Sequence, residues 1–501
     1  MKIWQDEIVF VFLQLQIRNY FFMAEIIGRK AEQAELLRIF NRRQAQLVAV
    51  YGRRRVGKTF LVRELLKEHF VFYHTGISTL ELEGLNMLDT QLTAFASTLA
   101  YSGASVSGRP KDWTEAFQWL RDFLDEQDSQ KRMVVFIDEM PWMDTPRSGF
   151  ISAFEHFWNG WGAGQDNLMM IVCGSATSWI EDNLINGYGG LYNRTSAEIR
   201  LSPFTLKETE QMLLSQGVTL SRYDIAQAYM AVGGIPYYLS YFQPGKSLAQ
   251  IIDNLFFERK AKLQNEFERL FNSIFTSPER FKTIVRLLAK RHIGYSRDEI
   301  SKLTGIPTGK DLSKTLKTLE ANDFIIKYKP FENDGKHLAY RLVDHFCLFF
   351  LRFFDGASRS ADYWQRHENA PGISSWRGIA FEEVCLSHLP QLKSALGISG
   401  VGVHASPWTL RGTEDQEGMQ IDLILERQDR VVNLCEMKFS VGEYEVDKVY
   451  EMKLRGRLQT IQQMINRRQN VQMTLVTTFG LRHGIHSGIF QQTVCIDELF
   501  Q

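Results

Sequence analysis

The sequence has no excess of charge of either sign, because 58 Lys and Arg residues balance 58 Asp and Glu residues over 501 positions. Global charge therefore points to no nucleic-acid or membrane-surface partner, and any basic face must be local. The most apolar runs are IVFVFLQLQIRNYFFM and FCLFFLRFF. Both are interrupted by polar residues and fall below the roughly 20 apolar residues that cross a membrane. We expect no membrane-spanning segment.

Cysteine is scarce, and no two cysteines form a CxxC pair, which argues against a zinc cluster and predicts a reducing cytoplasm. The five are Cys173, Cys347, Cys385, Cys435 and Cys495. With 44% hydrophobic and 23% charged residues, the composition is that of an ordinary globular protein, long enough for roughly two to four domains. Met23 opens a natural domain start, so residues 1–22 are either a translated extension or a mis-assigned start.

The stretch VAVYGRRRVGKTFLVREL breaks an apolar run with two glycines, a lysine and a threonine in the spacing GxxxxGK[ST]. We expect a buried strand over 45–51 and an amphipathic helix over 58–70. Glycine lets backbone N–H groups turn toward phosphate oxygens, Lys58 reaches the β- and γ-phosphates, and Thr59 ligates Mg²⁺. The alternative is a glycine-rich turn without a nucleotide. The predicted nucleotide-binding residues are Gly52, Arg53, Arg54, Arg55, Val56, Gly57, Lys58, Thr59 and Phe60.

A second motif, KRMVVFIDEM over residues 131–140, carries apolar residues that end in Asp138 and Glu139. We expect a Walker B strand in which Asp138 holds Mg²⁺ through water and Glu139 polarises the attacking water. A further strand is predicted over 168–176. Ser175 at its tip is either a sensor of the γ-phosphate or a helix N-cap. An added strand between the P-loop and Walker B strands is typical of the P-loop branch that uses a catalytic glutamate.

The chain contains, in this order, the segments IIGRKAEQAELLRI, YGRRRVGKTFLVREL, FIDEMPWM, VCGSATSWI, LYNRTSAEIRLSPF and VGGIPYYL. Over residues 23–345 they resemble the archaeal-type ATPase family, a group within the AAA+ and STAND-like P-loop ATPases. The resemblance implies that Gly28 and Arg29 lie beside the adenine and that residues 233–236 belong to a helical lid. It also implies that Arg194 is an arginine finger or sensor, with a surface ion pair as the alternative.

Residues 279–344 are predicted to form three helices and a β-hairpin about an ENDG turn, the pattern of a winged helix-turn-helix. The second helix opens with a capping box of Ser296 and Glu299. The segment carries 14 Lys and Arg against 9 Asp and Glu, a local excess of positive charge. The lysines that share one face of the third helix, where a recognition helix meets DNA, are Lys310, Lys314 and Lys317. The alternative is a segment that serves only for internal packing.

The C-terminal third contains an amphipathic helix over 376–389 and, later, MQIDLILERQDRVVNLCEMKFS, which predicts two strands about a turn near Asp429. A hairpin about that turn sets Asp422 opposite Glu436, because the two are equidistant from it. Glu436 and Lys438 are two residues apart, so their side chains leave the same face of the strand. Such a charged group is expensive to bury for stability alone.

This arrangement resembles the PD-(D/E)xK nuclease fold, and a DUF234-type domain with this pattern commonly follows the archaeal-type ATPase in one chain. The resemblance implies that Asp422 and Glu436 hold Mg²⁺, that Lys438 orients a metal-bound water, and that Glu382 supplies a further ligand. Ile421 stands where proline commonly precedes the aspartate. The alternative is a domain that binds nucleic acid without cleaving it.

We therefore predict an α/β fold: a P-loop NTPase with a parallel sheet sandwiched by helices, a helical lid, a winged helix-turn-helix and a C-terminal α/β restriction-endonuclease-like domain. The predicted boundaries are 1–22 for the extension, 23–200 for the ATPase core, 201–278 for the lid and linker, 279–345 for the winged helix, 346–375 for a connector, and 376–501 for the nuclease-like domain.

The predicted function is that of a cytoplasmic ATPase that needs ATP and Mg²⁺ and couples nucleotide binding and hydrolysis to a DNA-associated winged helix and a nuclease-like domain. Its predicted partners are ATP, DNA and a second copy of itself. The alternative is a STAND-type signalling switch that binds ATP tightly, hydrolyses it slowly, and uses an inactive C-terminal domain to bind a partner.

Overall fold

The computed structural model describes residues 25–78, 86–186, 190–191, 193–275, 277–331, 338–355, 359–410, 418–465 and 468–501. The predicted extension over residues 1–22 and the predicted ENDG turn lie outside these ranges. The chain forms two compact units. The first comprises Met1–Tyr51, Gly57–Ser175 and Trp179–Leu201, and the second comprises Gly52–Val56, Ala176–Ser178 and Ser202–Gln501. None of the helices in the described ranges has the length and hydropathy needed to cross a bilayer.

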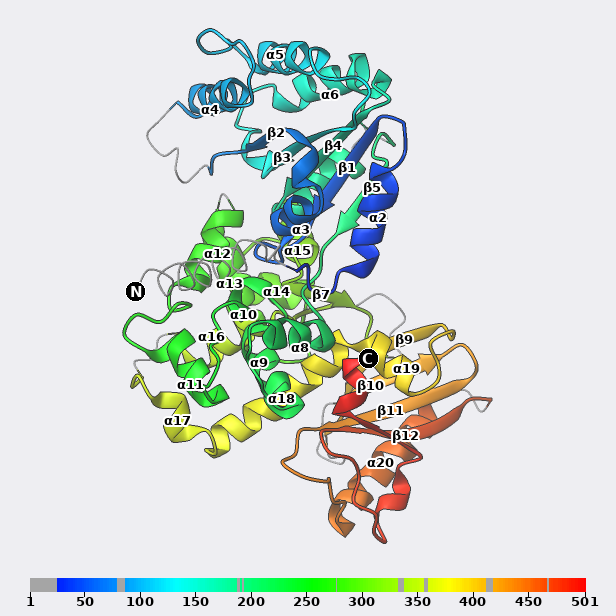
Figure 1. The fold of residues 1–501 in the computed structure, drawn as a ribbon. Coiled ribbons are helices and arrows are strands. Elements are labelled where there is room, and N and C mark those ends of the chain that lie inside the picture. The colour runs from blue at the N-terminus through cyan, green and yellow to red at the C-terminus, as the bar shows by residue number, and fades with distance from the viewer. Residues whose placement is uncertain are drawn as a thin grey trace, which may run out of the picture. The chain divides into compact units, whose positions relative to one another are not determined.

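A parallel five-stranded sheet lies at the centre of the first unit, in the order β2-β3-β4-β1-β5 (Figure 1). Its strands are β1 (Gln46–Tyr51), β2 (Phe70–Thr75), β3 (Met133–Asp138), β4 (Leu168–Gly174) and β5 (Ala197–Arg200). Strands β1, β3 and β4 are buried along their whole length, as expected of parallel strands covered on both faces. Strand β4 lies between β1 and β3, so the predicted inserted strand is confirmed.

Helices supply the cover for this sheet. Side chains of α4 (Met87–Tyr101), α5 (Trp113–Asp125) and α6 (Phe150–Gly160) join alternate residues of β1 in one apolar core that is rich in aromatic rings. The other helices of this part of the chain are α2 (Lys30–Phe40), α3 (Lys58–Leu66) and the short α7 (Thr177–Ile180). Because α3 starts directly after the glycine-rich loop, its N-terminus faces the position where β1 ends.

The second unit begins with five helices, which are α8 (Leu206–Ser215), α9 (Arg222–Val232), α10 (Pro236–Leu239), α11 (Leu248–Ile252) and α12 (Glu266–Ile274). Helix α9 is almost wholly buried and packs on α8 and on two later helices, α16 (His345–Phe353) and α18 (Pro371–Ser387). Rings from α16, α17 (Tyr363–His367) and α18 pack together at Phe349, Phe353, Trp364 and Trp376. The segment predicted as a connector is therefore a buried aromatic core.

The middle segment contains the three predicted helices, α13 (Pro278–Leu288), α14 (Arg297–Thr304) and α15 (Lys310–Ala321). An antiparallel sheet of order β6-β8-β7 accompanies them, formed by β6 (Tyr295–Ser296), β7 (Ile325–Tyr328) and β8 (Ala339–Leu342). The capping box at the start of α14 is present, with Ser296 and Glu299 each bonded to the other's backbone N–H. The prediction of that cap from sequence is confirmed.

A mixed sheet of order β13-β12-β11-β10-β9 forms the C-terminal part. Its strands are β9 (Val403–Leu410), β10 (Met419–Arg427), β11 (Val431–Lys438), β12 (Asn470–Thr477) and β13 (Gln492–Cys495), and it is accompanied by α19 (Leu389–Ala395) and α20 (Lys448–Met464). Strands β10 and β11 are antiparallel, with Leu423 opposite Cys435. The same register puts Asp422 beside Glu436, as the symmetry of the hairpin predicts. The turn uses Arg430 in the left-handed region, with φ 68.

Two predicted helix boundaries are wrong. The helix after the P-loop ends at Leu66, because Lys67–His69 form a 3-10 turn that leads directly into β2. The helix expected from residue 376 begins at Pro371, since proline lacks the backbone N–H that the first helical position does not need.

A buried histidine joins two helices of the second unit. His388 is 1% exposed, and its Nε2 accepts a hydrogen bond of 2.9 Å from the backbone N–H of Leu206, at the start of α8. Its Nδ1 lies 2.8 Å from the Val384 carbonyl, so Nδ1 carries the proton. Burial lowers the pKa of His388 to about 4. The ring is therefore neutral, and protonating Nε2 would remove the acceptor for Leu206.

We expect acid to destabilise the second unit through His388. Its native pKa lies below the unfolded value of about 6.5, so the unfolded chain binds the proton first. The contribution of neutral His388 to the free energy of unfolding is fully present above pH 6.5 and declines toward pH 4. At pH 5 roughly 2 kcal/mol of this contribution is lost. In His388→Asn, unfolding midpoints in denaturant at pH 7 and pH 5 should differ by less than in the wild type. An equal difference in both proteins would contradict this role.

Candidate nucleotide site and C-terminal carboxylate site

The loop between β1 and α3 has the backbone that a phosphate-binding loop requires. Gly52 and Gly57 have φ of 135 and 92, values that favour glycine because it has no Cβ. Gly57 is the N-cap of α3, so the first helical residues are Lys58 and Thr59. Their backbone N–H groups, together with the helix dipole, favour an anion at this end of the helix.

Thr59 and Asp138 meet although 79 residues separate them, because β1 and β3 run parallel and end at the same edge of the sheet. The Thr59 hydroxyl donates a hydrogen bond of 2.7 Å to Asp138 Oδ2. Burial, and secondly the neighbouring Glu139, raise the pKa of the Asp138 carboxyl. A hydroxyl and a buried carboxylate at this spacing form a donor set that fits Mg²⁺, which prefers oxygen ligands.

Ser175 lies against Glu139 and Lys58. The Ser175 backbone N–H donates to Glu139 Oε2 at 3.0 Å, and its hydroxyl donates to Oε1. Lys58 Nζ lies 3.3 Å from the same hydroxyl. The strand tip thus joins the P-loop lysine to the Walker B glutamate. The alternative role of Ser175 as a helix N-cap is not supported, because its hydroxyl binds Glu139 and α7 begins at Thr177.

Two arginines of the loop make ion pairs inside the second unit. Arg53 is 2% exposed and pairs with Asp344, the N-cap residue of α16. Arg55 Nη2 lies 2.9 Å from Glu266 Oε2, and its guanidinium lies 3.9 Å from the centre of the Tyr237 ring. Tyr237 belongs to the VGGIPYYL segment, so this segment binds a P-loop arginine.

Four further residues are predicted to act on the nucleotide, namely Gly28, Arg29, Phe60 and Arg194. Gly28 and Arg29 both have positive φ, and Arg29 is buried at the start of α2, whereas Phe60 is exposed. Arg194 is exposed in the loop before β5. The structure does not test whether these residues contact adenine or phosphate, so their roles stay predictions.

The C-terminal sheet brings Asp422, Glu436 and Lys438 together. Lys438 Nζ lies 2.7 Å from Glu436 Oε1 and 3.9 Å from Asp422 Oδ2. Burial, and then the charges of Glu436 and Glu382, raise the pKa of Asp422 well above its ordinary value. Burial would also raise the pKa of Glu436, but Lys438 and Arg457 outweigh burial and hold it below its ordinary value.

Glu382 lies near this cluster but turns toward another partner. Its Oε2 is 2.9 Å from His292 Nε2. Within the described ranges, no three His, Cys, Asp or Glu side chains come close enough to hold one metal ion. Two carboxylates, those of Asp422 and Glu436, fit Mg²⁺, since this ion commonly uses one or two carboxylates and completes its shell with water and phosphate oxygens. The geometry gives no support to Glu382 as a third ligand.

The lysines predicted to meet DNA lie on one exposed face of α15, opposite the buried residues Leu312, Leu316 and Leu319. They are Lys310, Lys314 and Lys317.

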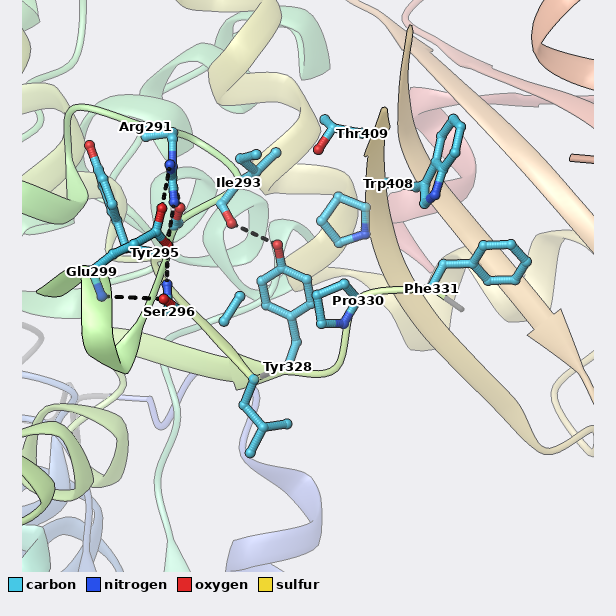
Figure 2. A pocket seen from close by; sticks show the side chains of 14 residues that line it. Arg291, Ile293, Tyr295, Ser296, Glu299, Tyr328, Pro330, Phe331, Trp408 and Thr409 are labelled. Atoms are coloured by element: carbon cyan, nitrogen blue, oxygen red, sulfur yellow. Dashed lines mark hydrogen bonds and ion pairs between the residues drawn. The ribbon is translucent and has the colours of Figure 1, made fainter. Parts of the chain in front are cut away.

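A cavity of about 530 Å³ lies beside the β7–β8 hairpin and β9. Its charged lining residues, Arg291 and Glu299, pair with each other, and the Tyr328 hydroxyl donates to the Ile293 carbonyl (Figure 2). The remaining lining includes four aromatic residues, Tyr295, Tyr328, Phe331 and Trp408. The sequence did not predict this cavity, which brings together residues 291–299, 328–339 and 407–409.

Comparison with known families identifies the first part of the chain. Residues 27–242 match the model of an ATPase domain found predominantly in Archaea. That match contains the loop with Lys58, the Thr59 and Asp138 pair, and the Glu139 and Ser175 contact. These residues form a P-loop ATPase domain that binds ATP, and the protein is an ATPase.

The individual relatives share less than a quarter of the aligned residues with this chain. An uncharacterized protein of Methanocaldococcus jannaschii, MJECL04, is 23% identical over 438 residues, which are 85% of this chain and 90% of the relative. The Walker-type ATPase PABY2304 of Pyrococcus abyssi is 21% identical, with a TM-score of 0.45, over 66% of this chain and 96% of its own. The ORC2 protein of Aeropyrum pernix, in ADPNP–ADP complexes, is 14% identical, with a TM-score of 0.39, over 66% and 93%. Similarity of this extent says nothing about a shared substrate.

Sequence reasoning missed the cationic partners of the buried carboxylates. Arg53 and Arg55 were expected to contact nucleotide, and they pair with Asp344 and Glu266. Arg457 was not predicted at all, although it pairs with Glu436. A signal for it existed, because residues 450, 454, 457 and 461 follow the spacing of one helix face.

We expect Lys58→Ala to lose most ATP affinity, because a charge-assisted phosphate contact disappears from a partly dehydrated site. Glu139→Gln should bind ATP and hydrolyse it poorly, since the base that polarises water is lost. Fluorescent-nucleotide titration and phosphate release measure the two effects. Wild-type hydrolysis by both variants would show that the active site is assigned to the wrong residues.

Proposed function

We propose that this ATPase couples its nucleotide state to a DNA-binding winged helix and a metal-dependent, PD-(D/E)xK-type nuclease domain. In this proposal residues 279–345 are the winged helix and residues 376–501 the nuclease domain, which is of DUF234 type. The observation that carries the proposal is the group of Asp422, Glu436 and Lys438 at one edge of a buried hairpin. Such a costly group of charges is more readily explained by chemistry than by stability.

Contacts inside the second unit support the coupling. Arg53 and Arg55 belong to the phosphate-binding loop and pair with carboxylates of this unit. Tyr223, on the lid helix α9, stacks on Phe439 with ring centres 4.7 Å apart, and Phe439 directly follows Lys438. Rearrangement of the loop on binding phosphate would therefore act on helices that pack beside the proposed nuclease site.

In the nuclease, Asp422 and Glu436 would hold Mg²⁺, which lowers the pKa of a bound water. Lys438, paired with Glu436, would orient that water. At the ATPase site, Thr59 and Asp138 would hold a second Mg²⁺ with the nucleotide, and Glu139 would polarise the attacking water.

We expect cleavage of DNA that needs Mg²⁺ or Mn²⁺, tested on single-stranded, duplex and branched substrates with and without ATP. Asp422→Ala and Glu436→Ala should each abolish cleavage because a metal ligand is lost. Lys438→Ala should lose cleavage and keep metal binding, since a cation is no ligand. All three should still hydrolyse ATP, because Lys58, Asp138 and Glu139 lie in the other unit.

Melting temperatures are the control for these variants. A variant that keeps its fold and loses cleavage supports the metal site. If the wild type cleaves none of the substrates and the three variants melt early, the charged group serves stability and the nuclease proposal is wrong.

For DNA binding, we expect reversal of Lys310, Lys314 and Lys317 to Glu to weaken affinity and to flatten its dependence on salt. Each lost phosphate contact lowers the slope of log K against log salt by about 0.9. The matched control reverses three exposed lysines of the first unit, Lys67, Lys111 and Lys131. Equal effects of the two triple variants would assign the binding to net charge instead of α15.

A STAND-type switch is the second candidate, and one observation favours it. Both carboxylate oxygens of Glu139 accept hydrogen bonds from Ser175, so each oxygen of the proposed base already has a partner. This candidate predicts slow ATP turnover that ignores DNA, together with ATP-dependent self-association. Light scattering and turnover with and without DNA distinguish it from the first, which predicts stimulation by DNA.

A further inference from the structure

Two polar side chains on one face of α20 reach the cluster of Asp422, Glu436 and Lys438. Leu454 and Ile461 are fully buried and fix the rotation of the helix. Tyr450 and Arg457 share that face, because they lie four residues before each of these positions. The Tyr450 ring lies 5.4 Å from Lys438 Nζ, and Arg457 reaches Glu436.

Glu436 is bound by a cation at each of its oxygens. Lys438 Nζ lies 2.7 Å from Oε1, and Arg457 Nη1 lies 2.5 Å from Oε2. Glu436 is 2% exposed, whereas the Arg457 side chain keeps 19% of its surface in contact with solvent. The carboxylate is therefore buried with both oxygens paired, and the arginine that pairs with it remains partly exposed to solvent.

A divalent cation cannot use Glu436 Oε2 while Arg457 occupies it, because Mg²⁺ needs the oxygen at about 2.1 Å. When both carboxylates are ionised, the formal charges of Asp422 and Glu436 balance those of Lys438 and Arg457. Adding a divalent cation makes the site net positive, which releases the arginine and favours an anion beside it.

We propose that Arg457 is the exchangeable counter-ion of the C-terminal site: it pairs with Glu436 until a divalent cation binds there, and then it pairs with a phosphodiester oxygen of the nucleic acid. This assignment rests on the proposed nuclease function. Arg457 is thus a positioning residue for Glu436 before the metal binds and a substrate-binding residue afterwards.

The test uses the full chain without nucleotide and titrates Mn²⁺ by calorimetry. Arg457→Gln should bind Mn²⁺ at this site about tenfold more tightly, since close charge pairs contribute at least this much. Arg455→Gln is the matched control, because Arg455 lies on the same helix, pairs with Glu451 and is 62% exposed. It should bind Mn²⁺ like the wild type. Asp422→Asn identifies which Mn²⁺ belongs to the site.

The second readout is binding of duplex DNA in Ca²⁺. Arg457→Gln should lower the salt slope by about 0.9, the value for one phosphate contact, and Arg455→Gln should leave it unchanged. Arg457→Lys, which keeps the charge, should restore most of the slope. If the Gln variant melts early, Arg457→Met carries the same forecasts, because it keeps the aliphatic stem.

Unchanged Mn²⁺ affinity in Arg457→Gln, with a Mn²⁺ site that Asp422→Asn removes, would overturn the role of Arg457 and leave the metal site standing. A Mn²⁺ stoichiometry that Asp422→Asn does not change would overturn both this role and the proposed nuclease site. Tighter Mn²⁺ binding together with a lower salt slope, both absent from Arg455→Gln, supports the exchange.

Discussion

The cost of burying a carboxylate governs the arrangement of both sites. Asp138, Asp344, Glu266 and Glu436 are each at most 4% exposed, and each has a partner from a distant part of the chain. An ionised carboxylate without such a partner would lose several kcal/mol of hydration free energy, and no hydrogen bond or ion pair would compensate for the loss. The contacts that join the helices of the second unit to the phosphate-binding loop are the ones that satisfy this requirement.

The parallel sheet decides how the predicted ATPase residues meet. Strands β1, β3 and β4 end at one edge, so Lys58, Asp138 and Ser175 come together there from positions far apart in sequence. In the C-terminal sheet a tight antiparallel turn also brings site residues together. Only a few residues of turn are needed to place Asp422 and Glu436 side by side. The first arrangement needs a whole domain, and the second needs one hairpin.

Several strands and one helix cap could be predicted from local sequence patterns. The apolar runs predicted β1, β3, β4, β10 and β11, because buried strands need continuous apolar side chains. The capping box of Ser296 and Glu299 was predicted because its hydrogen bonds span three residues. The ends of helices were predicted less accurately. Helix α3 stops at Leu66 and α18 starts at Pro371, where neighbouring turns compete with the helical pattern.

The sequence by itself determined the chemistry that each motif offers, namely a glycine-rich loop with Lys58 and Thr59, the pair Asp138 and Glu139, and a hairpin with Asp422 and Glu436. These follow from spacing along one strand, loop or turn. Only the tertiary structure decided which cation pairs with each carboxylate, as with Arg53 and Asp344. The physical reason is that an ion pair depends on distance in space, and packing brings together side chains whose separation along the chain carries no local signal.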